Sequence, residues 1–561
     1  MIYDQHLIQI ISQLSRKDFL ATYKEAQKAG DRESQLDLLR LRCATDIELF
    51  AATFFPHYCS REFNQFHRDL FSSFQYQERA VRRVRAAPRG SAKSTLATLI
   101  KPIHDISYGL ERFVVIISNT EPLATQKLKD IRNEILANPE LQDTYGVRFP
   151  VKRPGETQFI VESSAGQVAF MAFGRGAQVR GVRFGANRPT KVICDDVEHS
   201  DEVHNERIRQ KTHDWFFEDV VKVGDTGTTI EVVGTVLHKQ SLLSELIRNP
   251  AYDGEIYKSV ISWSDRQDLW EKWERIYTDL DNDKRIEDAQ RFYEENRSEM
   301  LKGTKVLWPE KEDYLALMKE LVEIGKRAFM KEKQNSPLGA DEAVFDRVHW
   351  YRETSINNGQ TRGIVIEATD AFISFSKLTP NAYGVMDPST GQVKAKSGKL
   401  GDWTCILSGF KDPTGRILVH EDWTKRVPPT RYIESIFEHH EKYQYVKFGV
   451  ETNLYRNLLM PNILSERQRR EEKRGGELLK IPFYDIEQVE NKVERIYRLE
   501  PKVSHGWVVF NRALSQEFKQ QLEDFPHADH DDCPDALEML WSLVHDKYRA
   551  SAVLASAFAG R

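Results

Sequence analysis

Hydrophobic residues follow two different spacings along the chain, and each spacing predicts a different kind of element. In residues 1 to about 50, apolar positions within HLIQIISQL and LDLLRLR recur every three or four residues, which indicates amphipathic helices. From about 80 to 240, apolar runs alternate with helical stretches; the runs are VRRVRAAP, FVVIISN, TQFIVES, QVAFMAFG, KVICDD and TIEVVGTV. Strands that alternate with helices predict an α/β fold with a mainly parallel sheet.

A second series of strands is expected after residue 345. Residues 263 to 335 are charged and helical, and turn-forming residues gather in NSPLGADEAVF at 335 to 345. Five strand-like runs follow, NAYGVMDPS, WTCILSGF, GRILVHEDWT, KFGVETN and HGWVVF, before the helix PDALEMLWSLVHDKY. We therefore expect a helical segment over 1–50, a first domain over 51–345 with a helical linker region from about 260, and a second domain over 346–561 with a short C-terminal tail.

Composition narrows the class of protein. The chain has 561 residues, of which 40% are hydrophobic and 29% charged, as is typical of a soluble protein of two or three domains. No apolar run approaches the roughly 18 residues needed to span a bilayer, and the first residues do not resemble a signal peptide. The five cysteines are scattered without paired spacing, which favours a reducing compartment.

Overall charge neither indicates nor excludes a nucleic-acid partner. The net charge is −5, from 80 basic and 85 acidic residues. A binding groove needs only a local basic surface, and RAVRRVRAAPR at 79 to 89 carries five arginines. The run RQRREEKR at 467 to 474 is mixed in charge, and we interpret it as a solvated helix face.

The stretch RAAPRGSAKSTL, residues 85 to 96, is close to the phosphate-loop pattern G-x-x-x-x-G-K-[ST]. Ala87 and Ala92 replace the two glycines, while Lys93 and Ser94 are in place. Such a loop presents backbone N–H groups to phosphates at a helix N-terminus; the lysine adds charge and the hydroxyl binds Mg²⁺. The alternative is a lysine and a serine at the start of an ordinary helix.

An acidic strand end about 100 residues later favours the nucleotide site. KVICDD ends in Asp195 and Asp196, and Glu198 follows two positions on. Asp195 would contact Mg²⁺ directly or through water, and either Asp196 or Glu198 could polarise the attacking water. The loop and the acidic strand, in this order, predict an ATPase that uses ATP and Mg²⁺.

The second domain carries a different set of acids. Asp387 and Glu451 each end a predicted strand, and Asp531, Asp532 and Asp535 stand at the start of the last helix. If these carboxylates converge, they suit one or two Mg²⁺ or Mn²⁺ ions that cleave a phosphodiester. Capping of the helix N-terminus is the alternative role for Asp532 and Asp535.

Zinc is not expected at the nearby HADHDDC stretch. His527, His530 and Cys533 have the spacing H-x-x-H-x-x-C, which is not that of a zinc finger, and no second pair lies close. His530 could instead assist the nuclease site, contact a phosphate or have a purely structural role.

In their joint order, these motifs resemble those of bacteriophage terminase large subunits, the motors that package DNA into capsids. APRGSAKST resembles the family's deviant phosphate loop, EFNQFHRDLF its adenine-contacting segment, GAQVRGVRFGANRPTKVICDD its arginine-finger segment and acidic strand, and VVGTVLH its coupling motif. LWPEK and QNSPLG resemble its linker region, so the likeness extends over about residues 50 to 550.

The resemblance implies roles for individual residues. Arg180, with Arg183 as second choice, would be the arginine finger, and Thr235 with Gly234 would couple hydrolysis to movement. The nucleotide would be bound by Gln65, Arg89, Gly90, Ser91, Ala92, Lys93, Ser94 and Thr95. Metal ions would be held by Ser94 and Asp195 in the first domain and by Asp387, Glu451, Asp535 and Asp532 in the second, while Asp402 would lie in a turn.

The fold implied by the resemblance is a P-loop ATPase domain of the ASCE type followed by an RNase H-like, resolvase-like nuclease domain. Such a protein hydrolyses ATP to move double-stranded DNA into a procapsid and cuts concatemeric DNA. The implied partners are DNA, the portal protein, a small terminase subunit and further copies in a ring, with no membrane. Lys394, Lys396 and Lys399 are candidate contacts to the DNA backbone, or belong to a solvated loop.

The implied location is the host bacterial cytoplasm, transiently on the portal, with the protein absent from the mature virion. Two other functions stay open. A helicase-nuclease of repair or recombination would share the chemistry, but helicases usually carry two motor domains, and the sequence holds one phosphate loop. A capsid or scaffold protein with decayed sites is the third, and the intact Lys93, Asp195, Asp387 and Glu451 argue against it.

Overall fold

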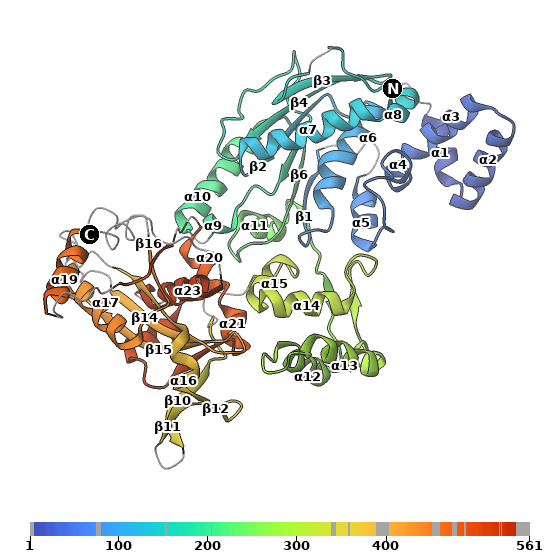
Figure 1. Cartoon of the computed structure of the whole chain (residues 1–561). Helices are drawn as coiled ribbons and strands as arrows, with labels where there is room; N and C mark the ends of the chain where they lie inside the picture. Colours follow the sequence, from blue (N-terminus) through green and yellow to red (C-terminus); the bar gives the residue numbers. More distant parts are fainter. Residues whose placement is uncertain are drawn as a thin grey trace. The chain divides into compact units, whose positions relative to one another are not determined.

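The computed structural model (Figure 1) describes residues 5–74, 80–151, 154–203, 205–337, 344–356, 360–388, 403–451, 460–473, 480–486, 488, 490–526, 528 and 530–545. The chain divides into two compact units. The first comprises Met1–Asp265, Leu301–Leu321 and Ala328–Leu338, and the second Arg266–Met300, Val322–Arg327 and Gly339–Arg561. Part of the predicted linker region therefore clusters with the second unit. No helix within the described ranges is long and apolar enough to cross a membrane.

A largely parallel sheet forms the centre of the first unit. Its strands, within the described ranges, are ordered β3 (Gln158–Ser163), β4 (Gly166–Gly174), β2 (Phe113–Ser118), β5 (Lys191–Asp195), β6 (Thr229–Gly234), β1 (Arg82–Ala86) and β7 (Asp253–Ile256). Only β3 pairs antiparallel, with β4 at the edge. β6 lies between β1, which leads into the phosphate loop, and the acidic strand β5, as in ASCE-type ATPases, so the predicted fold class is confirmed.

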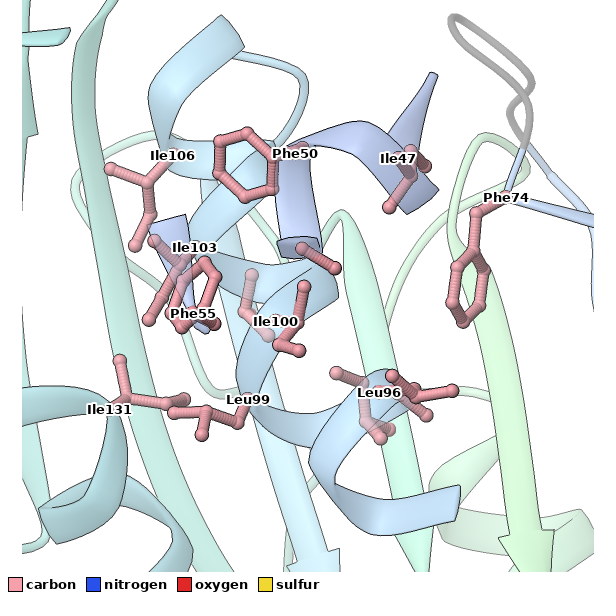
Figure 2. Packing of buried hydrophobic residues seen from close by; sticks show 14 of the residues in the cluster. Ile47, Phe50, Phe55, Phe74, Leu96, Leu99, Ile100, Ile103, Ile106 and Ile131 are labelled. Atoms are coloured by element: carbon pink, nitrogen blue, oxygen red, sulfur yellow. The ribbon is translucent and has the colours of Figure 1, made fainter. Parts of the chain in front are cut away.

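Both faces of this sheet are buried, which explains the unbroken apolar run of β2. Successive side chains of a strand point to opposite faces. Val114 and Ile116 join one core, and Val115 and Ile117 join the other. Figure 2 shows the first core, where helical side chains such as Leu96, Ile100 and Ile103 pack together.

The helices that belong to these two cores come from different parts of the unit. The first core is built with η1 (Thr95–Ile100), α6 (Lys101–Tyr108), α7 (Glu121–Ala137) and α8 (Pro139–Tyr145). The second is built with α9 (Ser200–Val203), α10 (Glu206–Trp215), η2 (Phe216–Val220) and α11 (Leu242–Arg248). The short strands β8 (Val260–Ser262) and β9 (Lys305–Val306) pair separately, followed by α14 (Tyr314–Ile324) and α15 (Lys326–Glu332).

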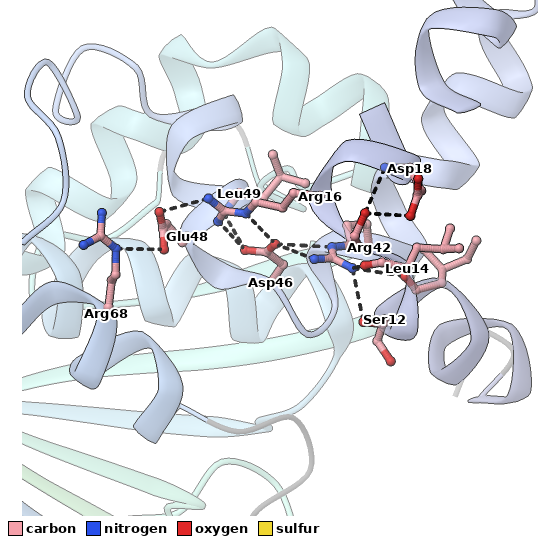
Figure 3. A network of polar contacts seen from close by, with 11 residues as sticks. Ser12, Leu14, Arg16, Asp18, Arg42, Asp46, Glu48, Leu49 and Arg68 are labelled. Carbon is pink, nitrogen blue, oxygen red and sulfur yellow. Dashed lines mark hydrogen bonds and ion pairs between the residues drawn. The ribbon is translucent and has the colours of Figure 1, made fainter. Parts of the chain in front are cut away.

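The N-terminal residues form helices, as predicted: α1 (Gln5–Gln13), α2 (Arg16–Lys28), α3 (Arg32–Cys43), α4 (Ile47–Phe54) and α5 (Gln65–Ser73). A polar network holds them together (Figure 3). Arg42 donates to the carbonyl oxygens that end α1 and pairs with Asp46 at 3.2 Å. Arg16 bridges Asp46 and Glu48, each at 3.2 Å, and Glu48 lies 3.8 Å from Arg68 of α5. These helices are thereby joined to the element that precedes β1.

A row of buried charges runs between α6 and three sheet strands. Lys101 pairs with Asp105 one helical turn on. Lys191 of β5 lies 3.0 Å from Asp105 and 3.3 Å from Glu231 of β6, which lies 3.5 Å from Arg83 of β1. All five side chains are buried, so their charges are balanced by one another rather than by water.

The second unit has its own sheet, with described strands in the order β12 (Ala371–Ser374), β11 (Thr361–Ile366), β10 (His349–Ile356), β18 (Val508–Asn511), β15 (Ile417–Lys425), β14 (Thr404–Lys411), β13 (Ala382–Asp387), β16 (Lys447–Glu451) and β17 (Phe483–Ile486). β13, β14 and β15 pair antiparallel, while β16 and β17 add parallel to β13. Across the sheet these five strands are ordered β15, β14, β13, β16, β17. If β13 is counted as the first in the chain, this is the order 3-2-1-4-5 of the RNase H-like fold predicted above.

All five strands expected in this region are present, and β10, β11, β12 and β17 were not expected from the sequence. Polar residues interrupt the apolar pattern of β10, and β12 and β17 have four residues each. Besides the adjoining ends of α14 and α15, the helices in the described part of the unit are α12 (Gln267–Thr278), α13 (Arg285–Met300), α16 (Phe375–Leu378), η3 (Thr379–Asn381), α17 (Pro429–Tyr443), α19 (Met460–Lys473), α20 (Lys492–Tyr497), α21 (Glu500–Ser504), α22 (Gln516–Asp524) and α23 (Asp532–His545).

Candidate nucleotide and metal sites

The loop from β1 to η1 has the backbone of a phosphate-binding loop. Gly90 and Ala92 both lie in the left-handed region, with φ of +81° and +63°. Left-handed residues next to right-handed ones turn successive N–H groups toward one concavity. Ala92 therefore takes the conformation that glycine would take, at some cost in strain. Ala87 continues the strand instead, because its N–H donates to the carbonyl of Gly234 at 3.0 Å.

The loop lysine is held against the end of β6. Lys93 is buried, and its Nζ donates to Oγ1 of Thr235 at 3.2 Å. The Thr235 hydroxyl in turn lies 3.4 Å from the carbonyl oxygen of Ala87. The two residues predicted to bind phosphate and to couple hydrolysis to movement are thus in direct contact.

The loop serine meets the acidic strand. Ser94 Oγ donates to Asp195 Oδ1 at 2.9 Å, and Asp195 is fully buried. Its other oxygen accepts from Thr98 Oγ1 at 2.7 Å and from Lys127 Nζ at 2.5 Å. A hydroxyl and a carboxylate side by side are the protein ligands that an ATP-bound Mg²⁺ needs.

Thr98 and Lys127 were not identified from the sequence. Thr98 follows Ser94 by one helical turn, and that spacing was the available signal. Lys127 reaches the site because of how α7 packs, for which the sequence pattern holds no signal.

Two acids after Asp195 were candidates to polarise water, and they have different surroundings. Asp196 has φ of +48°, and its half-exposed carboxylate lies 3.9 Å from Lys93 Nζ. Glu198 instead accepts the N–H groups of Leu242 at 2.9 Å and Leu243 at 3.1 Å, the first residues of α11. Burial raises the pKa of Glu198, while these two hydrogen bonds oppose that shift. Glu198 therefore caps α11, while Asp196 is the acid that lies beside Lys93.

The candidate arginines are either paired with other residues of the chain or exposed to solvent. Arg180 Nε donates to the carbonyl oxygen of Glu218 at 2.8 Å and pairs with Asp219 Oδ1 at 2.8 Å, both in η2. Arg183 is exposed. Arg89 is also exposed and pairs with Glu332 at 3.0 Å. In this chain none of the three has a described contact with Lys93.

Gln65, the expected base reader, is exposed and bonds to Asp69 Oδ1 at 2.6 Å within its own helix. Two positions on, His67 is buried and its Nε2 lies 2.9 Å from the carbonyl oxygen of Ser91 in the loop. His67 Nδ1 accepts the N–H of Asn64 at 3.1 Å, so the ring proton is on Nε2 and is donated to Ser91. Burial lowers the pKa of His67 to about 4.

The LWPEK segment closes this side of the loop. The Trp308 ring meets His67 edge-on, with centroids 4.5 Å apart, and Lys311 donates to the carbonyl oxygen of Gly90. A shallow pocket beside the loop is lined by Asn64, Pro88, Arg89, Gly90, Ser91, Ser259, Leu307, Trp308, Glu312 and Leu317. His67 and Lys311 are contacts that sequence reasoning did not identify; the N-x-x-H spacing of a capping box was the available signal for His67.

In the second unit the predicted acids converge at one end of the sheet. Asp387 ends β13 and Glu451 ends β16, and these strands are parallel neighbours with Met386 opposite Val450. The first turn of α23, which packs on β13, supplies Asp532 and Asp535. We call Asp387, Glu451, Asp531, Asp532 and Asp535 the acid cluster.

Burial and mutual repulsion disfavour the ionised carboxylates of Asp387 and Glu451 in the acid cluster. Burial raises the pKa of Asp387 well above its ordinary value; Lys492 opposes that shift, and the other carboxylates add to it. Burial and the charge of Asp535 likewise raise the pKa of Glu451. Oδ2 of Asp387 is buried without a hydrogen-bond partner among the described residues. Carboxylate oxygens are the ligands that a hard divalent cation prefers.

Two cations lie among these acids. Lys492 Nζ is 2.8 Å from Asp531 Oδ1, 3.2 Å from Asp535 Oδ2 and 3.7 Å from Asp387 Oδ2. Arg495 Nη2 donates to Asp535 Oδ1 at 2.9 Å. Across the described part of the chain, no group of three or more His, Cys, Asp or Glu side chains is arranged to hold a metal ion.

The remaining candidates have ordinary surroundings or lie outside the described residues. Asp532 Oδ2 accepts the N–H of Trp403 at 3.2 Å, and Arg426 donates to His530 Nε2 at 2.8 Å. Cys533 is buried, with its sulfur 3.6 Å from Thr424 Oγ1. His527, Lys394, Lys396, Lys399 and Asp402 lie outside the described residues.

No family model and no curated protein matches the chain. Among solved structures, it is similar to the large terminase of a thermophilic bacteriophage, at 9% identity and a TM-score of 0.40, over 86% of this chain and 99% of that one. It is similar to the HK97 bacteriophage large terminase at 11% identity and 0.30, over 89% and 99%. It is also similar to the human cytomegalovirus terminase nuclease domain at 12% identity and 0.24, over 33% and 92%.

Proposed function

We propose that the chain is a terminase large subunit, which hydrolyses ATP to drive double-stranded DNA into a procapsid and cuts concatemeric DNA with a metal-dependent nuclease. The observation that carries this proposal is the contact of Ser94 with Asp195, beside a buried Lys93, in a chain whose second sheet gathers the acid cluster. A motor and a nuclease site in one chain match the work of cutting and packaging DNA.

In the ATPase half, Lys93 and the loop N–H groups would bind the phosphates, and Ser94 and Asp195 would hold Mg²⁺. Bound Mg²⁺ would neutralise charge on the phosphates. Asp196 would orient the attacking water, and Thr235 would sense the phosphates through its bond to Lys93. Because Thr235 directly follows β6, a shift of Lys93 would be passed to a central strand.

In the nuclease half, Asp387, Glu451, Asp532 and Asp535 would hold Mg²⁺ or Mn²⁺. Such ions supply an activated water and stabilise the leaving oxygen. The chain's own contribution would be to bring acids from two neighbouring strand ends and one helix start near one another, with Asp387 almost fully buried. DNA would be bound mainly through its phosphates, because a translocating motor cannot depend on sequence.

The partners follow from this activity. Arg180 is half-exposed, so a neighbouring subunit could receive it in a ring assembled on the portal protein. A small terminase subunit would recognise the packaging site. The protein would act in the host bacterial cytoplasm, transiently on the portal, and be absent from the mature virion.

The test is a paired assay on the purified full chain, measuring ATP hydrolysis and Mn²⁺-dependent nicking of plasmid DNA. Lys93→Ala is expected to lose hydrolysis and keep nicking, while Asp387→Ala is expected to do the opposite. Lys24→Ala and Glu523→Ala, at exposed helix positions, are matched controls. Full ATP turnover in Lys93→Ala, or full nicking in Asp387→Ala, would contradict the corresponding half.

A further inference from the structure

One cation in the acid cluster is not explained by the helix that carries it. Lys492 is the first residue of α20, after the cap Asn491. A positive charge in the first turn is opposed by the helix dipole, which favours acids there. The position of Lys492 is therefore set by the carboxylates of Asp387, Asp531 and Asp535, all within 3.7 Å of its Nζ.

The ammonium group of Lys492 contacts the carboxylates that a bound metal ion would contact. Its single ammonium lies between a strand end, β13, and the first turn of α23, which are the two elements that would share a bound ion. Burial opposes its charge, yet the three carboxylates hold the pKa of Lys492 above its ordinary value.

Arg495, one helical turn after Lys492, differs from it in exposure and in its partners. Its side chain is 9% exposed and is tied to both Asp535 and Glu538. Lys492 is 33% exposed and has no described carboxylate partner outside the acid cluster. Arg495 is thus a buried and fixed part of the site. Lys492 is partly exposed, so its side chain can move away from the acids into solvent.

We propose that Lys492 is a positioning residue of the nuclease metal site, which holds the acid cluster together in the metal-free protein and must be displaced when a divalent cation binds. This inference rests on the proposed nuclease function. It assigns Lys492 a competitive role: the tighter its ion pairs, the weaker the apparent affinity for metal. The nuclease then stays unloaded until the metal concentration is high.

The experiment measures Mn²⁺ binding to the full chain by isothermal titration calorimetry, with no DNA present. Lys492→Met, which keeps the length and removes the charge, is expected to bind Mn²⁺ about tenfold more tightly, because one competing cation within about 4 Å is gone. In the absence of metal, the same variant is expected to unfold at a lower temperature. Lys492→Arg should restore both values toward those of the native chain.

Lys473→Met, at an exposed position of α19, is the matched control and should change neither quantity. A merely structural lysine would give the opposite sign, since its loss would disorder the acids and weaken binding. Unchanged or weaker Mn²⁺ binding in Lys492→Met overturns the inference. If the native chain binds Mn²⁺ and Asp387→Ala does not, the metal site itself stands. Absence of binding in every variant would remove the proposed metal site together with the inference.

Discussion

Ser94 and Asp195 are 101 positions apart in the chain, and a hydrogen bond of 2.9 Å joins Oγ of the serine to Oδ1 of the aspartate. The bond closes the loop after β1 onto the end of β5, although β6 lies between these strands. Any chemistry at this site depends on the two side chains keeping that separation. The proposed ATPase can therefore be tested one contact at a time.

Replacement of Ser94 by alanine is expected to slow Mg²⁺-dependent ATP hydrolysis on the order of 100-fold, because the hydroxyl is a metal ligand in the proposed site. Steady-state phosphate release at several Mg²⁺ concentrations measures the effect. Thr98→Ser keeps a hydroxyl beside Asp195 and is the control. A Ser94→Ala rate within twofold of the native one would rule out the assigned role.

Substitutions of Asp196 and Glu198 should have different effects, the first on ATP hydrolysis and the second on stability. Asp196→Asn is expected to reduce hydrolysis by on the order of 10²- to 10⁴-fold while nucleotide still binds, because a water-polarising carboxylate is lost. Glu198→Gln is expected to cost about 1 kcal/mol of stability, because two N–H groups of α11 lose a charged acceptor. Phosphate release and thermal unfolding of both variants measure the two effects. The reverse pattern would return the catalytic role to Glu198.

His67 gives the fold a dependence on pH. Because burial lowers the pKa of His67 to about 4, the unfolded chain, with a pKa near 6.5, binds the proton more readily. The stabilising effect of neutral His67 is thus complete above about pH 6.5 and is lost as the pH falls toward about 4. Between pH 7.5 and 5.5, His67→Gln should lose about 1 kcal/mol less than the native chain in urea unfolding. Parallel losses would show that folding does not lower the pKa of His67.

In the metal-free protein, Asp387 is expected to stabilise the fold less than an asparagine at the same position would. Its raised pKa means that the ionised carboxylate opposes folding as the pH rises above the ordinary range for aspartate. Asp387→Asn should therefore raise the metal-free melting temperature by a few degrees at pH 7 and also remove the further rise caused by Mn²⁺. Differential scanning calorimetry with and without Mn²⁺ checks both. A lower metal-free melting temperature would mean that Lys492 stabilises Asp387 more than burial costs.

The sequence predicted those parts of the sites that depend on local spacing. Lys93, Ser94 and Asp195 follow from a loop pattern and a strand end, and Asp387 and Glu451 from two strand ends. What the sequence did not reveal depends on packing between distant elements. Lys127 reaches Asp195 only because α7 lies on the sheet, and Glu198 meets its N–H donors only because α11 packs nearby. Gln65 instead bonds within its own helix, to Asp69 four positions on. The functional roles of these residues stay predictions.

The fold, too, was predicted where local sequence carries a signal and missed where it does not. Buried strands such as β2 and β13 show as unbroken apolar runs, because both faces of the sheet are covered. In the hairpin of β10 and β11, Arg352 and Glu353 of β10 lie opposite Val365 and Ile364 of β11, so β10 carries no continuous apolar signal and β11 only a short one. Their pairing depends on backbone bonds that composition does not reveal.

The buried row of charges between α6 and the sheet has an evolutionary consequence. Along the row, Lys101, Asp105, Lys191, Glu231 and Arg83 alternate in sign, so each inner member serves two neighbours. Loss of Lys191 alone would remove a cation from both Asp105 and Glu231, whereas loss of the terminal Arg83 would weaken one pair. In homologous chains these positions should therefore change together rather than singly, and correlated replacement should be strongest at the middle of the row.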